Sequence, residues 1–180
     1  MSSKIRIATC SLAGCFGCHM SFLDIDERIL KLLEHVEFDR SPIDDIKHIS
    51  GPVDVGIIEG GVCNAENVHV LHEFRKNCRI LVAAGECSVT GGIPSMRNGF
   101  TLKECLEESY IQGFGVEFAH IPNDPELPLL LNKVYPLHEV VKIDYFLPGC
   151  PPSADAFWHF LTELLAGRDP RLPRELIHFD

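Results

Sequence analysis

The chain has 180 residues, which is long enough for one domain with a substantial core. Its formal net charge of -10 at pH 7 argues against a nucleic-acid partner. No apolar run reaches the roughly 18 residues of a membrane-spanning helix, and residues 1–4 lack the features of a signal peptide. We therefore expect a cytoplasmic protein without a membrane partner.

Apolar runs and turn residues predict alternating strands and helices. We expect strands at residues 5–9, 36–40, 53–58, 79–84 and 140–147. Helices are expected to begin near Ser21, at 67–76, at 102–110, and after a cap at Ser153 with Gly167 just past its end. Residues 113–136 should be irregular. This order predicts one α/β domain over residues 1–180, with a flavodoxin-like, doubly wound and mainly parallel sheet.

Four cysteines follow the carboxyl ends of predicted strands. Cys15 and Cys18 come after the first strand, Cys87 follows the fourth, and Cys150 follows the last. Because parallel strands end at one edge of a sheet, we expect these four thiols to converge there. Four thiolates are the ligands of a [4Fe–4S] cluster, although structural zinc takes the same set.

Glycines accompany each of these cysteines. Gly14 and Gly17 lie on either side of Cys15, Gly85 lies two residues before Cys87, and Gly149 precedes Cys150. We expect the first two to adopt positive φ and to let the backbone approach a cluster closely. Backbone N–H groups from Gly14 to Met20 and near Gly149 are candidate donors to cluster sulfurs. A thiol oxidoreductase using Cys15 and Cys18 stays open, but it leaves Cys87 and Cys150 unexplained.

The other cysteines are expected to be small buried hydrophobic residues. Cys10 lies within the first strand, Cys78 begins the fourth strand at the opposite edge, and Cys105 lies within a helix. Cys63 follows a strand at the correct edge, so topology alone leaves it as a replacement ligand.

Three segments carry a resemblance to a known family. Residues 12–24 read LAGCFGCHMSFLD, residues 85–94 read GECSVTGGIP, and residues 148–152 read PGCPP. Together they resemble the small subunits of nickel–iron hydrogenases, and the first is similar to the NAD-reducing, bidirectional type. The related small subunit of the complex I quinone reductase has adjacent cysteines where this chain has Cys15-Phe16-Gly17-Cys18, so we disfavour it.

The resemblance implies a function for the four cysteines. In that family the matching residues, here Cys15, Cys18, Cys87 and Cys150, ligate the [4Fe–4S] cluster nearest the nickel–iron site. The nickel–iron site itself would belong to a partner large subunit, because the family's site needs two Cys-x-x-Cys pairs and this chain has one. The implied protein is the electron-transfer subunit of a hydrogen dehydrogenase. It would pass electrons to the iron–sulfur and flavin subunits of a diaphorase that reduces NAD⁺.

Other residues near the cysteines permit alternatives. Thr9 and Ser11 offer hydroxyls for FMN, but the cysteines occupy that loop and we do not favour flavin there. We expect His19 to be a plain interface residue rather than a hydrogen-bond donor to the cluster, and leave Glu59 and Glu86 as proton relays, partner contacts or solvated carboxylates. The loop carrying Phe16, Met20 and Phe22 is expected to face the large subunit. A zinc-stabilised interaction module remains the alternative from a different functional class.

Overall fold

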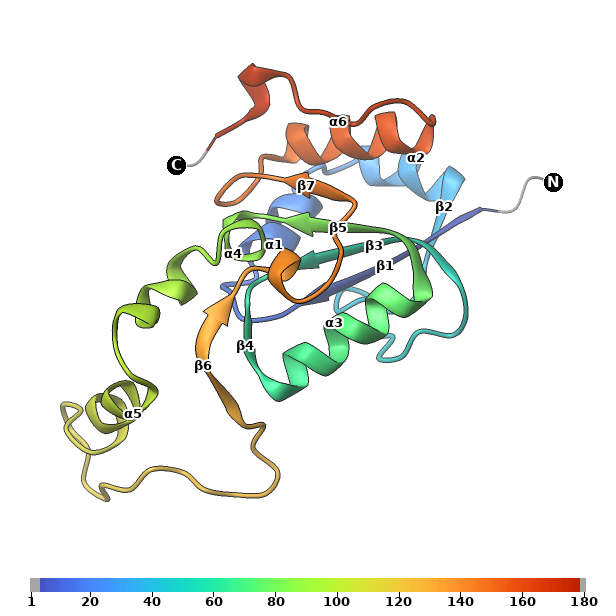
Figure 1. The fold of residues 1–180 in the computed structure, drawn as a ribbon. Coiled ribbons are helices and arrows are strands. Elements are labelled where there is room, and N and C mark those ends of the chain that lie inside the picture. The colour runs from blue at the N-terminus through green and yellow to red at the C-terminus, as the bar shows by residue number, and fades with distance from the viewer. Residues whose placement is uncertain (1–3, 179–180) are drawn as a thin grey trace.

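The computed structural model describes residues 4–178 and contains a five-stranded parallel sheet (Figure 1). Its strands are adjacent in the order β2-β1-β3-β5-β7. The bounds are β1 (Ile5–Ser11), β2 (Val36–Phe38), β3 (Val53–Glu59), β5 (Cys78–Ala84) and β7 (Tyr145–Leu147). When only these five strands are numbered in chain order, the sheet has the flavodoxin-like order 2-1-3-4-5. This order confirms the predicted fold class.

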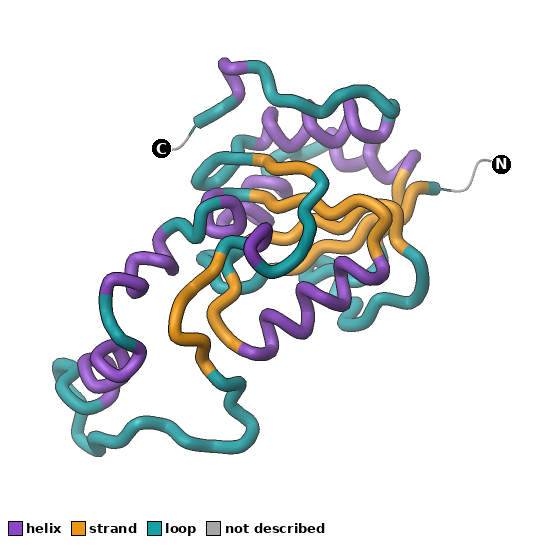
Figure 2. Tube along the Cα trace, viewed as in Figure 1, coloured by secondary structure: helices purple, strands orange, loops and turns teal. Residues whose placement is uncertain are grey.

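Helices cover both faces of the sheet, as the tube in Figure 2 also shows. One face packs against α1 (Gly17–Leu23), α2 (Arg28–His35) and α6 (Ala154–Leu165), through Phe22, Leu32 and Phe157. The other face packs against α3 (Ala65–Asn77) and the short η2 (Leu137–Glu139), through Leu71, Phe74 and Leu137. Strand residues alternate between the two clusters, so Ile7 faces the first and Ala8 the second. Burial on both faces explains the continuous apolar strands.

Several elements differ from the prediction. Helix α1 begins at Gly17 rather than near Ser21, and β7 covers only the end of the predicted strand 140–147. A second sheet pairs β4 (Val62–Asn64) with β6 (Leu130–Tyr135), which lies partly in the segment expected to be irregular. The sequence did not indicate β6, because only Val134 is buried in this strand and the apolar/polar alternation of a half-buried strand is missing.

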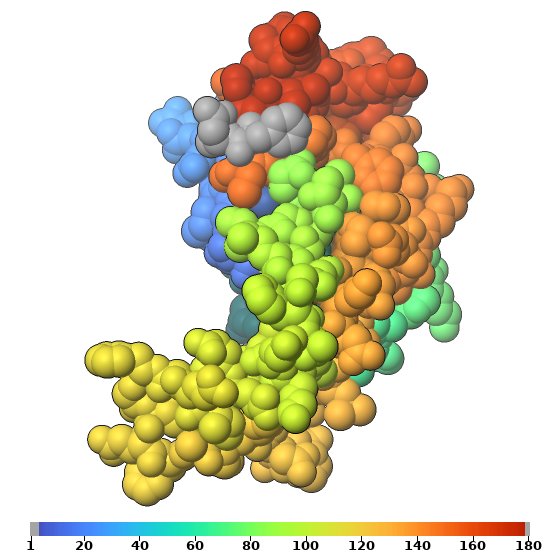
Figure 3. All heavy atoms as spheres, turned by 60° about the vertical axis from the view of Figure 1, so that its left-hand side comes forward, coloured from blue at the N-terminus to red at the C-terminus, as the bar shows by residue number. Residues whose placement is uncertain are grey.

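The segment between β5 and β6 projects from the body of the fold. It contains α4 (Glu86–Val89), η1 (Ile93–Gly99) and α5 (Leu102–Tyr110). Elsewhere in the chain, a short helix η3 (Arg174–Leu176) follows α6. In Figure 3 the yellow-green part of the segment between β5 and β6 runs down the middle of the view against the body, and the yellow part extends away from it at the lower left. Among residues 4–178, no helix combines the length and apolar character needed to span a membrane.

Candidate metal centre

The cysteine-bearing loops are tied together at the carboxyl edge of the sheet. The Leu12 N–H donates to the Glu59 carbonyl (2.9 Å), and Ala13 and Gly61 exchange two backbone hydrogen bonds. On the other side, the Glu86 N–H donates to the Gly149 carbonyl (2.9 Å). The Ser21 hydroxyl donates to the Pro152 carbonyl (2.6 Å), which joins α1 to the loop after β7. These bonds bring the loops carrying Cys15, Cys18, Cys87 and Cys150 to one place.

The four thiols are close enough to influence one another electrostatically. Burial raises the pKa of Cys18, and the charges of Glu59, Cys87 and Cys15 raise it further. Burial also raises the pKa of Cys87, with additional contributions from Cys150 and Cys15. All four cysteines are free thiols, and Cys15 and Cys150 are exposed. The predicted ligands therefore converge, and their binding of a cluster stays a prediction.

Glycines lie against three of these sulfur atoms. A Cβ atom at Gly85 would lie 2.2 Å from Cys18 Sγ, and one at Gly92 would lie 3.1 Å from Cys87 Sγ. A Cβ at Gly17 would lie 3.1 Å from Cys15 Sγ, whereas Gly14 packs against the Gly60 Cα. Side chains at these positions would fill the space around the thiols. The sequence indicated Gly85 as the glycine beside Cys87 but did not place it among the cofactor-binding residues, and it assigned Gly92 no role at the site.

The backbone of the first loop departs from the prediction at one residue. Neither Gly14 nor Gly17 adopts positive φ, and Phe16 does so instead, with φ 65°. A phenylalanine in this region is unusual, because its Cβ crowds the backbone. The Phe16 ring stacks on His19 with centroids 4.7 Å apart, a contact that compensates for the backbone conformation. The reversal at Phe16 also explains why α1 begins directly at Gly17.

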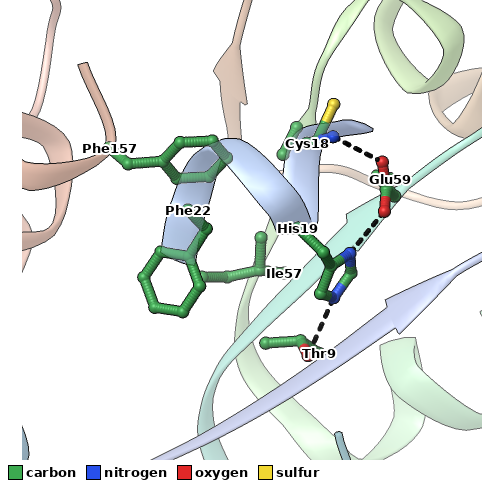
Figure 4. Close-up of a pocket in the computed structure, with 8 residues that line it drawn as sticks. Thr9, Cys18, His19, Phe22, Ile57, Glu59 and Phe157 are labelled. Atoms are coloured by element: carbon green, nitrogen blue, oxygen red, sulfur yellow. Dashed lines mark hydrogen bonds and ion pairs between the residues drawn. The ribbon is translucent and has the colours of Figure 1, made fainter. Parts of the chain in front are cut away.

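A buried hydrogen-bond chain supports the loop from below (Figure 4). The Cys18 N–H donates to one Glu59 carboxylate oxygen (3.0 Å), and His19 Nδ1 contacts the other. His19 Nε2 lies 3.0 Å from the Thr9 hydroxyl, which lies 2.9 Å from the Ser41 hydroxyl. All four side chains, those of Glu59, His19, Thr9 and Ser41, are less than a tenth exposed.

This chain of hydrogen bonds corrects the expectations for His19 and Glu59. His19 is 5% exposed, so it is a core residue rather than an interface residue. Because a carboxylate only accepts, Nδ1 carries a proton toward Glu59, and Thr9 engages the other nitrogen. No ring N–H remains for a cluster sulfur. Glu59 is neither solvated nor available to a partner, whereas Glu86 is partly exposed and accepts from the Thr90 hydroxyl (3.0 Å).

The expected interface loop is only partly exposed. Met20 is 46% exposed, but Phe22 is 4% exposed and packs against Phe38 and Phe157. The prediction that Phe22 faces a partner was wrong, because the early start of α1 turns this side chain into the core. Met20 remains available on the outer side of the helix.

The remaining cysteines are engaged elsewhere. Cys10 and Cys78 are buried, as expected, and burial raises their pKa to about 11 and about 12. Cys105 is half-buried in α5 rather than in the core. Cys63 lies in β4, where its thiol lies 3.3 Å from the Asn67 side-chain oxygen.

The chemistry of the donor set fits an iron–sulfur cluster. Hydrogen bonds join the three loops that carry the four thiols at one edge of the sheet, and glycines lie against three of the sulfur atoms. Four cysteine thiolates are the ligand set that a [4Fe–4S] cluster takes. Within residues 4–178, no three Cys, His, Asp or Glu side chains lie close enough together to hold a single metal ion. A cubane binds each thiolate through a different iron, so it takes ligands that are more widely separated than a zinc ion does.

Comparisons with known sequences show which proteins this chain resembles. Residues 15–164 match the family described as NADH ubiquinone oxidoreductase, 20 Kd subunit. The chain is 49% identical to the delta subunit of the NAD-reducing hydrogenase HoxS of Cupriavidus necator, over 98% of this chain and 86% of that protein. It is 40% identical to a subunit of the F420-non-reducing hydrogenase of Methanothermobacter thermautotrophicus, over 96% of this chain. The chain spans 57% of that longer archaeal relative.

Solved structures give the same result for the fold. A chain of an NAD⁺-reducing [NiFe]-hydrogenase in the H₂-reduced state superposes with a TM-score of 0.95 at 54% identity, covering 99% of this chain and all of that one. A chain of the Ni-Fe-Se hydrogenase from Desulfomicrobium baculatum superposes with a TM-score of 0.58 at 16% identity, over 97% of this chain and 69% of that one. The second likeness bears on the fold alone.

Proposed function

We propose that this chain transfers electrons in an NAD-reducing hydrogenase. It belongs to the family of small subunits that includes the 20 Kd subunit of NADH ubiquinone oxidoreductase and the small subunits of nickel–iron hydrogenases. In this proposal Cys15, Cys18, Cys87 and Cys150 hold one [4Fe–4S] cluster. A large subunit carries the nickel–iron site, and a diaphorase with iron–sulfur and flavin subunits reduces NAD⁺. The single-domain organisation and the cytoplasmic location remain predictions.

The proposal is supported by the hydrogen bonds that join the three cysteine-bearing loops at one edge of the sheet. When bound, an iron–sulfur cluster supplies one-electron transfer. The surrounding residues fix the ligands before it binds: Ser21 anchors the loop after β7, and Glu59 holds the Cys18 amide. Preorganised ligands move little, which suits a site that must change charge without rearranging.

The alternative within the family is the quinone-reductase subunit whose name the matching family bears. We favour the hydrogenase subunit because Phe16 and Gly17 separate Cys15 from Cys18 and give the loop its reversal. The identities to hydrogenase subunits support the same choice. We give FMN no role, because Thr9 is already bonded to His19 and Ser41.

Exposure of the complex to H₂ tests the proposal. The chain would be purified anaerobically with its large subunit and without the diaphorase, and its absorbance near roughly 400 nm followed. We expect H₂ to bleach this band in the complex and to leave it unchanged in the isolated chain. A band that dithionite bleaches but H₂ does not, in a complex that contains nickel, would contradict the proposal.

A further inference from the structure

The projecting segment that follows α4 along the chain and ends within β6 has no hydrophobic core of its own. No residue from 92 to 133 is buried, and this range includes η1, α5 and the long loop that follows. We call residues 92–133 the arm. Nevertheless α5 is a formed helix, with a complete capping box between Thr101 and Glu104. Leu102, Leu106 and Leu131 are only half-buried, so the arm gains little to offset the entropy of ordering it. We infer that a partner supplies further contacts.

The arm also exposes large apolar side chains in unusual number. Phe114 is fully exposed, Phe118 is 85% exposed and Leu129 is 81% exposed. Other members are Ile93, Met96, Phe100, Tyr110, Leu127 and Leu130. Soluble monomers seldom expose contiguous apolar surface on this scale, and such surface marks an interface.

The total surface of the chain supports the same interpretation. The accessible surface is 10672 Å², whereas a compact monomer of 20.1 kDa is expected to expose about 8,700 Å². The excess of about 2,000 Å² is comparable to one partner's share of a large, permanent interface.

The arm continues directly from the candidate metal centre. Gly92, the first residue of the arm, lies against Cys87, because a Cβ at Gly92 would lie 3.1 Å from the Cys87 sulfur. Ile93 and Met96 are 70% and 73% exposed at this junction. In Figure 3 the yellow part of the arm extends to the lower left, and the blue N-terminal part of the body lies above it on the same side. A partner seated over the cysteines would therefore also meet the arm.

The charged residues of the arm distinguish between the partners that could bind it. The arm carries three basic residues, Arg97, Lys103 and Lys133, and six acidic ones, Glu104, Glu107, Glu108, Glu117, Asp124 and Glu126. A second copy of this chain, with its net charge of -10, would repel the arm, as would an anionic lipid surface. The complementary surface is apolar with basic residues around it.

We propose that the arm is a clamp for the nickel–iron large subunit, so that this one partner covers both the cysteine edge and the inner surface of the arm. This inference rests on the proposed function, because the occupant is the subunit whose metal site must approach the cluster. The large subunit is expected to present apolar pockets bordered by Lys or Arg, which receive Phe114 and Phe118 and pair with the acidic residues of the arm.

Binding of arm variants to the large subunit tests the inference. Phe114→Asp and Phe118→Asp would be combined in the full chain, with Leu30→Asp as the control, because Leu30 is 66% exposed on α2 and lies outside the arm. We expect the double variant to weaken binding by roughly tenfold or more and the control to leave it within about twofold. Circular dichroism and iron content should stay unchanged in all of them, since no substituted residue is buried.

Hydrogen exchange provides a second, independent measurement. Amides in residues 112–129, which lie between α5 and β6, should exchange rapidly in the isolated chain and slowly in the complex with the large subunit. Double-variant binding equal to that of the wild type, or loss of the diaphorase alone, would overturn the inference and leave the proposed function intact. A wild-type chain that holds its cluster and does not bind the large subunit would overturn both.

Discussion

The Glu59 carboxylate accepts a hydrogen bond from the Cys18 backbone N–H at 3.0 Å and contacts His19 with its other oxygen. It thereby joins the end of β3 to the loop after β1, although Cys18 and Glu59 are 41 positions apart. A buried carboxylate in this position fixes one of the four candidate ligands from within the core.

Removal of this carboxylate should destabilise the fold. Glu59→Ala leaves the Cys18 amide and the His19 ring without their partner, so we expect a loss of about 3 kcal/mol in the free energy of unfolding. Glu59→Gln keeps an acceptor for the amide and should lose less. Urea unfolding followed by circular dichroism measures both, with partly exposed Glu86→Gln as the control. A Glu59→Ala variant as stable as the control would refute the role.

Acidification should remove the same contribution. Burial alone would raise the pKa of Glu59, but hydrogen bonds from His19 and Cys18 and the charge of His19 outweigh it, so its pKa lies below the ordinary value. Stability from this lowered pKa is fully present above the unfolded value of about 4.3 and is lost as pH falls through the folded value. The difference in unfolding free energy between wild type and Glu59→Gln should therefore shrink below about pH 4. A constant difference down to about pH 2 would contradict this assignment.

The sheet, both helical layers and the placement of the cysteine-bearing loops at one sheet edge could be predicted from the sequence. Buried parallel strands are continuous apolar runs, and their carboxyl ends share one edge. The positive φ of Phe16 could not, because glycines flank it and are the usual choice there. The pairing of β4 with β6 and the bond from His19 to Glu59 join distant positions, and no local pattern encodes them. For the bond from His19 to Glu59, the only signals in the sequence were a histidine beside Cys18 and a glutamate at the end of a strand.

Serine substitutions should distinguish the cysteines that bind the cluster from those that do not. Cys87→Ser and Cys150→Ser are expected to lose or convert the cluster, whereas Cys78→Ser and Cys105→Ser should keep it. Cys78 lies at the amino end of β5, the edge opposite Cys87, and Cys105 is in α5. The electron paramagnetic resonance signal of the reduced cluster reports the outcome. Loss of that signal in folded Cys78→Ser would show that the topological argument is wrong.

Asp144 should stabilise the junction before β7. Its carboxylate accepts from Arg75 (2.6 Å) and from the Leu81 N–H (2.9 Å), and it joins α3 and β5 to the edge of the sheet. Asp144→Ala leaves both donors without this partner, so we expect a loss of about 1–3 kcal/mol in unfolding free energy. Thermal or urea unfolding measures it, with exposed Asp169→Ala as the control. Equal midpoints for the two variants would contradict this role.

Iron and sulfide analysis of the chain tests the central claim most directly. After anaerobic reconstitution, the isolated wild-type chain should contain about four irons and about four sulfides, with no bound nickel. The four-cysteine site accounts for this stoichiometry, and Cys87→Ser should reduce it. A chain that instead binds one zinc without sulfide, holds about two irons, or retains nickel tightly would contradict the account.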